Sequence, residues 1–595
     1  MFSGPLRLYE ARANPHGADD SRLFLVKGDP TIASAEEIIP AEGVLLPPPR
    51  ADLDLCNCHL KIFHINDLHG HIAQITANGD QPILSRFVSR LREVRLRYRD
   101  DPNTAVLAMS AGDDLVGAIF DELMGDNPDS FALHAGYRLY SAAGIDVAVL
   151  GNHDFDLGTE VLSQAILKDA QFPILSANLI NCRRLAGLYY PAVILVTKGI
   201  RVGIIGLSTP APIRHSLNTN PQITNPLLVI NNILPALRPL CDVLIILSHL
   251  GNNLSSGSAS VRVVGDRELA RGFSPGSVHL IVGGHTHTIL NEQGLAVDNI
   301  VNGIPIVQAG TLGRYLGEVD ITFHRGKPAV SHARLSQTAN LPVDETFERE
   351  SVRPLLEMAR PLFTRSLGQV ISHPDLSTYA VRNEFATGES ALANFIADAL
   401  VARCHAQGVA ADFAIVDSSV VRSGLPENEL TFGAWFRIMP FADVLRIIWI
   451  TGEQLKMLIR DNAHRLDLPG EPHTERGFLH FSHQIRYKVE IDGCQTGMCV
   501  REIMVNGIPL EEQLDISFRM VCTSFVREPA ATWEKYAMRT LDIPLMDIHQ
   551  LAYRDTHLFL RHELVAYISE NGGVNKKGGA KRDGRIQIIY EGQGS

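Results

Sequence analysis

Short apolar runs rich in β-branched residues recur between residues 59 and 325, and they constrain the fold more than any other feature of the sequence. HLKIFHI, NTAVLAMS, RVGIIGLS and CDVLIILS are four of these runs, each long enough for one buried strand. Segments with helical spacing of apolar residues, such as SRFVSRLREVRLRY, lie between several of them. Strands that alternate with helices are typical of a sheet whose faces are covered by helices. The sequence therefore predicts an α/β sandwich in this region.

The chain is too long for one hydrophobic core, with 595 residues of which 45% are hydrophobic and 20% charged. Its start is rich in Pro, Ala and acidic residues and ends in LLPPPRADLDLCNC, which is typical of an extension and a stiff linker. A charged segment with helical spacing separates the first αβ region from a second one. We expect an extension and linker at residues 1–58 and a first α/β domain at residues 59–340. An interdomain helix at residues 341–366 and a C-terminal α/β domain at residues 367–595 should follow.

Charge and hydropathy argue against two classes of protein, those that bind nucleic acid and those that span a membrane. The net charge of −12 argues against a nucleic-acid binder, because affinity for a phosphate backbone comes largely from clustered Lys and Arg. No apolar stretch is long enough for a membrane-spanning helix, and the start lacks the pattern of a secretory signal. We therefore predict a cytoplasmic protein that binds neither membrane nor nucleic acid, and the sequence leaves an exported form open. The eight cysteines are too sparse for a disulfide framework, so we expect free thiols.

Five polar clusters stand at or just after the ends of the apolar runs. They are NDLHGH (66–71), SAGDD (110–114), GNHDFD (151–156), SHLG (248–251) and GGHTH (283–287). In α/β sheets the carboxyl ends of the strands are where loops converge on one site. Taken singly, each cluster also suits an ordinary polar turn. All five in one region predict a shared site.

The residue types in these clusters are those that bind transition metals. Carboxylate, imidazole and amide groups together favour Mn, Zn, Fe or Co over Ca or Mg, which prefer oxygen alone. Seven ligands are too many for one ion, so we predict two divalent cations sharing a bridging group. The candidate ligands are Asp67, His69, Asp113, Asn152, His249, His285 and His287.

The order of the clusters, D-x-H, GD, GNH[DE], a later isolated His and GH-x-H, resembles the blocks of the calcineurin-like metallophosphoesterases. Within that group, GNHDFDxG, GGHTH and the second region resemble the 5'-nucleotidase family, which includes UDP-sugar hydrolases and 2',3'-cyclic phosphodiesterases. The resemblance covers about residues 59 to 595 and is strongest in the first domain. It implies a four-layer αββα sandwich, a C-terminal α/β domain of the 5'-nucleotidase type and a metal-dependent phosphoester hydrolase.

The resemblance also implies roles for individual residues. Asp67, His69, Asp113 and His287 would hold one metal, and Asp113, Asn152, His249 and His285 the other, with Asp113 as the bridge. His153 matches the family's catalytic histidine, and Asp156 matches the carboxylate that orients it. His153 could instead be a strut behind the metal ligands.

In the second domain the family supplies arginines for phosphate or ribose and two aromatic rings that hold the base. Arg382, Arg422, Phe441 and Phe525 occupy these positions, although each Phe also suits a core position. The chain departs from the family in reading DSSVVR (417–422) for N-x-GG-x-R and VREP (526–529) for a glycine-rich loop, and extra residues separate Arg382 from Glu389 and Ser390. The departures weaken the assignment to nucleotides more than the assignment to phosphoester hydrolysis.

The leading hypothesis is a dinuclear-metal phosphoester hydrolase that releases phosphate from a nucleotide or a related small phosphorylated metabolite. A UDP-sugar or dinucleotide pyrophosphatase and a 2',3'-cyclic-nucleotide phosphodiesterase share this chemistry. A catalytically silent binding protein is a hypothesis of a different class, and a nuclease of the same superfamily is a third alternative. The acidic charge counts against the nuclease.

Overall fold

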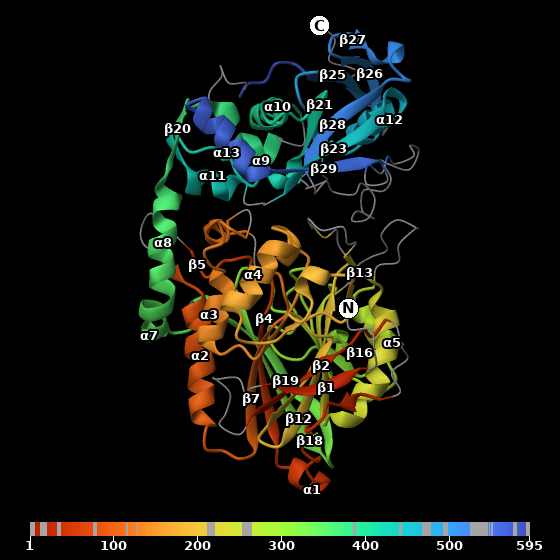
Figure 1. Ribbon diagram of the computed structural model, residues 1–595. Coiled ribbons are helices and arrows are strands. Elements are labelled where there is room, and N and C mark those ends of the chain that lie inside the picture. The colour runs from red at the N-terminus through yellow and green to blue at the C-terminus, as the bar shows by residue number, and fades with distance from the viewer. Residues whose placement is uncertain are drawn as a thin grey trace. The chain divides into compact units, whose positions relative to one another are not determined.

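The computed structural model describes residues 6–11, 21–31, 37–74, 80–114, 117–125, 128–210, 213, 221–252, 264–384, 388–439, 443–466, 478–491, 498–523, 546, 548, 551–574 and 580–590. The chain divides into two compact units at Ala359 and Arg360. Each unit is described by itself below (Figure 1).

Two sheets form the centre of the first unit. The larger has nine strands in the order β16-β17-β15-β14-β12-β11-β2-β1-β3 and the smaller has six in the order β19-β18-β4-β7-β8-β9. The nine strands are β1 (Arg7–Ala11), β2 (Arg22–Lys27), β3 (Ile39–Pro40), β11 (Ala192–Thr197), β12 (Ile200–Ser208), β14 (Val243–His249), β15 (Leu280–Val282), β16 (Ile300–Val301) and β17 (Ile304–Val307). The six are β4 (His59–Ile65), β7 (Thr104–Ser110), β8 (Val147–Val149), β9 (Ile174–Leu175), β18 (Tyr315–His324) and β19 (Lys327–Gln337).

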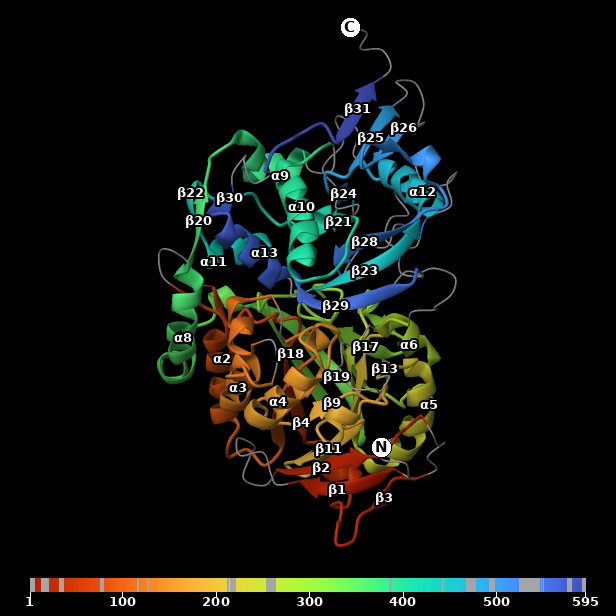
Figure 2. The same cartoon turned by 45° about the horizontal axis from the view of Figure 1, so that its top comes forward.

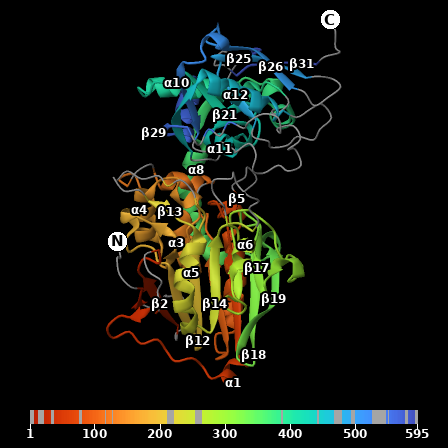
Figure 3. The same cartoon turned by 90° about the vertical axis from the view of Figure 1, so that its right-hand side faces the viewer.

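The two sheets pack face to face through one apolar core. Ile62 and Leu107 of the smaller sheet and Ile204 and Ile245 of the larger belong to the same buried cluster. Helices α2 (Leu84–Arg97), α3 (Ala135–Ala143) and α4 (Thr159–Asp169) lie on the side of the smaller sheet (Figure 1). Helices α5 (Pro226–Leu237) and α6 (Asp266–Gly272) pack against the larger sheet (Figure 3). This is the αββα arrangement that the resemblance implies.

Parallel pairing brings the carboxyl ends of the site-bearing strands to one edge of each sheet. β4 runs parallel to β7, with Ile65 opposite Ser110, and β12 runs parallel to β14, with Ser208 opposite His249. β14 is also parallel to β15. Since parallel strands end at the same edge, the five polar clusters follow strand ends that lie side by side.

Part of the segment that we predicted as an extension and linker belongs to the fold of the first unit. β1 and β2 form an antiparallel hairpin, and β2 continues the larger sheet by pairing with β11, with Phe24 opposite Ile194. β3 then pairs with β1 (Figure 2). The hairpin therefore covers the edge that β11 would otherwise expose.

The second unit is also an α/β fold, and its sheets have the orders β24-β21-β28-β23-β29, β27-β26-β25-β31 and β22-β20-β30. A buried cluster joins the first two of these sheets to α12 (Gly452–Ala463), and α10 (Ala391–Ala406) packs against α13 (Leu560–Glu570) and β21 (Figure 2). Its strands are β20 (Ser366–Val370), β21 (Phe413–Asp417), β22 (Asn428–Thr431), β23 (Val444–Thr451), β24 (Leu479–Phe481), β25 (Ile485–Ile491), β26 (Met498–Val505), β27 (Ile508–Pro509), β28 (Ser517–Thr523), β29 (Tyr553–Phe559), β30 (Gly573–Val574) and β31 (Ile586–Tyr590).

Helical structure also covers the segment predicted as an interdomain helix. α7 (Glu345–Phe347), a π-helical turn at Glu348–Val352 and α8 (Arg353–Thr364) follow one another there. Among the described residues, no helix has the length and hydropathy needed to cross a bilayer. The seven cysteines in the described part of the chain are free thiols.

The N-terminal hairpin should contribute to the stability of the first unit. Phe24 is completely buried, so Phe24→Ala should lower the free energy of unfolding of this unit by about 3–5 kcal/mol. Pulse proteolysis in urea, with fragments of the first unit quantified by mass spectrometry, measures the change. Leu45→Ala, at a position 76% exposed, is the matched control and should change stability by less than about 0.5 kcal/mol. Equal stability of the two variants would show that the hairpin is not packed.

Candidate metal centre

The seven candidate ligands come from loops of both sheets in the first unit. Asp67 and His69 follow β4, Asp113 follows β7 and Asn152 follows β8, all in the smaller sheet. His249 ends β14 of the larger sheet. His285 and His287 follow β15, its neighbour in that sheet.

The structure brings six of these side chains together as two groups of three. In each group the possible ligand atoms lie within 4.8 Å of one another. One group holds Asp67, His69 and His287, and the other holds Asp113, His249 and His285. Asp67 Oδ1 of the first group lies 3.9 Å from His249 Nε2 of the second, so the groups adjoin.

Asn152 joins the second group through its amide oxygen. Its Oδ1 lies 2.9 Å from His285 Nδ1. The backbone amide of the next residue, His153, donates to Asp113 Oδ1 at 2.8 Å. The loop after β8 therefore contacts both the histidine and the carboxylate of this group.

A cation would stabilise the arrangement of His249 Nε2 and Asp113 Oδ2. His249 Nδ1 lies 2.6 Å from the carbonyl oxygen of Ala111 and must donate to it, which leaves a lone pair on Nε2 of the neutral ring. Nε2 is buried 3.0 Å from Asp113 Oδ2, and it has no hydrogen-bond partner of suitable geometry within the described structure. A lone pair that faces a carboxylate is stabilised by a positive charge between them, so the residues present fit a divalent cation.

The contact between His249 and Asp113 shifts the pKa of both side chains. Burial alone would lower the pKa of His249, but the carboxylates of Asp113 and Asp67 outweigh it and raise the pKa to about 10. Burial raises the pKa of Asp113, but the imidazoles of His249 and His153 outweigh it and hold the pKa well below its usual value. A proton and a metal ion therefore compete for this position.

His69 and His285, which lie beside this contact, are neutral near pH 7. Burial lowers the pKa of His69 to about 4 and that of His285 to about 4. The Nε2 atoms of His69 and His287 lie 3.3 Å apart, and His287 Nε2 is 3.3 Å from Asp67 Oδ1. Neutral imidazoles have the lone pairs that metal coordination requires.

The backbone is strained at five of the seven candidate ligands. Asp67, His69, Asp113, His285 and His287 have positive φ angles of 49°, 48°, 53°, 75° and 54°. Non-glycine residues adopt this region at a cost of about 1–3 kcal/mol each, and such residues gather at functional sites. The strained positions thus coincide with the candidate metal centre.

Asn66 is a contributor that the sequence reasoning missed, although it stands inside the NDLHGH cluster. The residue is buried, and its Nδ2 donates to Asp67 Oδ2 at 2.7 Å and to the Gly310 carbonyl at 2.6 Å. Its Oδ1 accepts from the Ala309 amide at 2.8 Å. An amide directly before a carboxylate at a strand end was the available signal.

His153 and Asp156 form a hydrogen-bonded pair beside the two groups. His153 Nδ1 lies 2.8 Å from Asp156 Oδ2, and the two side chains are 36% and 28% exposed. The His153 ring lies edge-on to the His69 ring, with centroids 5.3 Å apart. The pair is thus adjacent to the candidate ligands and open to solvent, which suits contact with a substrate.

Comparison with known proteins agrees with this geometry. Residues 60–288 match the model of the calcineurin-like phosphoesterases, and residues 369–534 match that of the 5'-nucleotidase C-terminal domain. The chain combines a calcineurin-like phosphoesterase domain with a 5'-nucleotidase C-terminal domain. The family resemblance and the two-domain fold predicted from the sequence are therefore confirmed.

Individual relatives are distant. The mouse 5'-nucleotidase is 25% identical over 469 residues, which cover 72% of this chain and 76% of the relative. The trifunctional nucleotide phosphoesterase of Bacillus subtilis is 24% identical over 78% of this chain, which spans only 32% of that longer protein. The structure of a 5'-nucleotidase precursor from Thermus thermophilus covers 89% of this chain and 99% of its own, with a TM-score of 0.56 and 23% identity.

Of the four candidate substrate residues in the C-terminal domain, two lie in the part of the chain that the structure describes. Arg422 is exposed, and its backbone amide donates to the Ile438 carbonyl at 2.9 Å. Arg382 lies in α9 (Thr378–Glu384). Phe441 and Phe525 lie outside the described residues. The substrate assignments therefore stay predictions.

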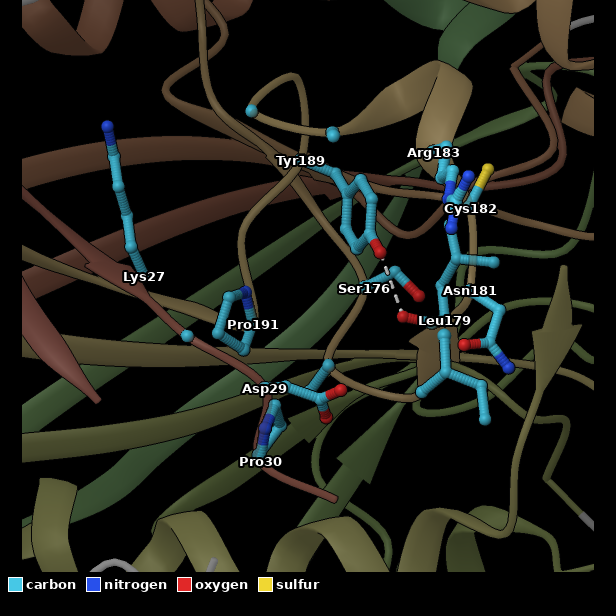
Figure 4. Close-up of a pocket in the computed structure, with 15 residues that line it drawn as sticks. Lys27, Asp29, Pro30, Ser176, Leu179, Asn181, Cys182, Arg183, Tyr189 and Pro191 are labelled. Carbon is cyan, nitrogen blue, oxygen red and sulfur yellow. Dashed lines mark hydrogen bonds between the residues drawn. The ribbon is translucent and has the colours of Figure 1, made fainter. Parts of the chain in front are cut away.

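A separate pocket of the phosphoesterase domain contains none of the candidate ligands. It lies between the end of β2 and residues 176–191, and Asp29, Ser176, Arg183 and Tyr189 are among the residues that line it (Figure 4). Tyr189 donates to the Leu179 carbonyl at 2.9 Å. Because its volume is only about 60 Å³, the pocket is too small for a nucleotide.

Gly151 should be essential for metal binding, because its backbone passes close to Asp113. A Cβ at position 151 would lie 2.5 Å from the Asp113 amide nitrogen and closer still to Asp113 Oδ1. Gly151→Ala should therefore displace the carboxylate and weaken Mn²⁺ binding at least about tenfold. Equilibrium dialysis with elemental analysis measures this loss. Gly272→Ala, where the added carbon meets open space, is the control, and equal metal binding by both variants would contradict the packing argument.

Proposed function

We propose that this chain is a dinuclear-metal phosphoester hydrolase that releases phosphate from nucleotides or related small phosphorylated metabolites. The observation that carries the proposal is the adjoining pair of three-residue groups, Asp67 with His69 and His287, and Asp113 with His249 and His285. Carboxylate and imidazole donors in this mixture favour Mn, Zn, Fe or Co. The match to the calcineurin-like phosphoesterase model and the relatives named 5'-nucleotidase support phosphoester hydrolysis as the reaction.

In the proposed site each group would hold one cation, Asn152 would join the second group, and Asp113 would be the shared ligand. Two bound divalent cations supply hydroxide at neutral pH and offset the negative charge of the phosphoryl group. The loops of both sheets fix the donor atoms before substrate arrives, so little reorganisation is needed during the reaction.

His153 and Asp156 carry the remaining chemistry in this proposal. The carboxylate of Asp156 holds the proton on His153 Nδ1 and thereby fixes the tautomer. The imidazole then acts through Nε2, where it stabilises the phosphoryl oxygens or protonates the leaving alkoxide. An imidazole is suited to protonating a leaving alkoxide, because the pKa of imidazole in water lies near neutrality.

The proposed substrate class rests on the second domain and on the names of the relatives, which are 5'-nucleotidases. Arg382, Arg422, Phe441 and Phe525 are the proposed contacts to phosphate, ribose and base. Stacking on aromatic rings tolerates different bases, so we expect a broad preference among nucleotides. The predicted cytoplasmic location stays a prediction.

Phosphate release from 5'-AMP, 3'-AMP, 2',3'-cyclic AMP, UDP-glucose, NAD and single-stranded DNA tests the function. We expect turnover of 5'-AMP with Mn²⁺, and its loss with a chelator. Asp113→Asn should remove both bound metal and activity, because it replaces the bridging charge. Activity that survives this substitution would refute the proposal, and metal binding without turnover would favour a silent binding protein. Preference for UDP-glucose or NAD would favour a pyrophosphatase, and preference for the cyclic nucleotide a phosphodiesterase.

His153→Ala should separate catalysis from metal binding. We expect kcat for the best substrate to fall by about 10²–10⁴, since proton transfer is lost, while the metal content stays at two ions per chain. Steady-state kinetics and elemental analysis measure the two effects. His332→Ala, at an exposed position on β19, is the control and should match the parent protein. Loss of metal from His153→Ala would assign His153 to the ligand set instead.

A further inference from the structure

Gln308 lies at the end of β17 and is completely buried in the first unit. The residue is an amide within the apolar run IPIVQAG, and it supplies none of the candidate ligand atoms. β17 is the parallel neighbour of β15, the strand that leads into the loop with His285 and His287. Gln308 therefore stands directly beside that loop.

The loop of residues 283–290 wraps around Gln308. The Gly283 amide donates to the Val307 carbonyl at 2.8 Å, and the Leu290 amide donates to the Gln308 carbonyl at 3.1 Å. Inside this loop the side chain of Gln308 makes three further hydrogen bonds. Its Nε2 donates to the Gly284 carbonyl at 2.6 Å, and its Oε1 accepts from the Thr286 hydroxyl at 3.2 Å and from the Thr288 amide.

These contacts hold one particular peptide group at both ends. In the peptide between Gly284 and His285, the carbonyl oxygen accepts a hydrogen bond from Gln308 Nε2. The amide of the same peptide donates to the carboxylate of Asp67, at 3.0 Å from Oδ2 and 3.2 Å from Oδ1. A peptide group is planar, so fixing its two ends fixes its rotation. That rotation sets the φ of His285, which is +75° and thus unfavourable without support.

The same contacts couple the loops of the two sheets. Asp67 follows β4 of the smaller sheet, whereas His285 follows β15 of the larger. The segment after Gln308 also reaches Asp67, because the Leu312 amide donates to the Asp67 carbonyl at 2.8 Å. A change at Gln308 therefore alters the histidine loop and its contact with a carboxylate of the other sheet.

We infer that Gln308 is a positioning residue that holds the loop carrying His285 and His287 in the conformation that binds the cation pair. The inference rests on the proposed metal centre and adds to it a residue that touches neither ion. Because Gln308 contacts backbone groups on both sides of His285 and His287, its loss should disturb both metal positions. The effect should appear in metal affinity and in the spectrum of the bound ions.

Gln308→Met tests the inference, because it keeps the side-chain length and removes the donor and the acceptor. Mn²⁺ binding is measured by equilibrium dialysis and by electron paramagnetic resonance. The parent protein should bind two Mn²⁺ with a spectrum of exchange-coupled ions. Circular dichroism checks that the variant is folded. The variant should bind Mn²⁺ at least about tenfold more weakly, and it should lose the spectrum of coupled ions at the same concentration of free Mn²⁺.

Asn462→Leu is the matched control for the loss of a buried amide. Asn462 lies in the C-terminal domain, is completely buried, and its side chain donates to the Leu479 carbonyl at 2.8 Å and accepts from the Leu479 amide at 2.7 Å. This variant should melt at a lower temperature and still bind two coupled Mn²⁺. A similar loss of metal in both variants would reduce the role of Gln308 to general stability and overturn the inference.

Gln308→Leu provides the second variant and decides the question by the same criterion if the Met variant does not fold. Its apolar side chain has neither a donor for the Gly284 carbonyl nor an acceptor for the Thr288 amide. We expect the same weakening of Mn²⁺ binding. Two tightly bound, coupled ions in a folded variant would overturn the inference, whereas a parent protein that binds no Mn²⁺ would refute the metal centre itself.

Discussion

The apolar contact between the two sheets of the first unit determines where all the candidate ligands lie. Asp67, Asp113 and Asn152 extend from the smaller sheet, and the three histidines at 249, 285 and 287 extend from the larger. The donor atoms meet only because the buried faces of the sheets, with Ile62, Leu107, Ile204 and Ile245 among them, are held together. The hydrophobic core thus positions the polar groups at its edge, although none of its residues takes part in the chemistry.

The site itself opposes stability in several ways. Buried carboxylates and imidazoles are crowded together away from water, and five residues have left-handed backbone angles. Each of these features is unfavourable in isolation. The surrounding hydrogen bonds, such as those of Asn66 with Asp67 and of Gln308 with Gly284, hold the arrangement. A site of this kind is prepared for positive charge before any ion binds.

Sequence reasoning predicted the strands and the clusters because their signals are local. Apolar runs of strand length mark β4, β7, β14 and β15 directly, and the polar clusters follow them without a gap. The two-domain family followed from the order of those clusters. In the second unit the helix at Ala391–Ala406 and the strand at Phe413–Asp417 were also visible as periodic or apolar segments.

The features that sequence reasoning missed depend on long-range contacts. β2 is a short run in a segment rich in Pro and acidic residues, and its pairing with β11 joins residues about 170 positions apart, as in Val26 with Ala192. Gln308 is one amide directly after a short apolar strand, and only the structure of the loop around it reveals its three partners. Backbone angles such as the φ of His285 follow from such contacts and leave no pattern in the residue types.

The division of the centre between two sheets has a consequence for synthesis of the chain. His69 and His287 are separated by 218 residues, so the group that contains both is incomplete until most of the first unit has left the ribosome. Ions captured earlier by the N-terminal carboxylates would meet only part of their coordination shell. Complete coordination of a cation pair by these residues would therefore have to follow assembly of both sheets.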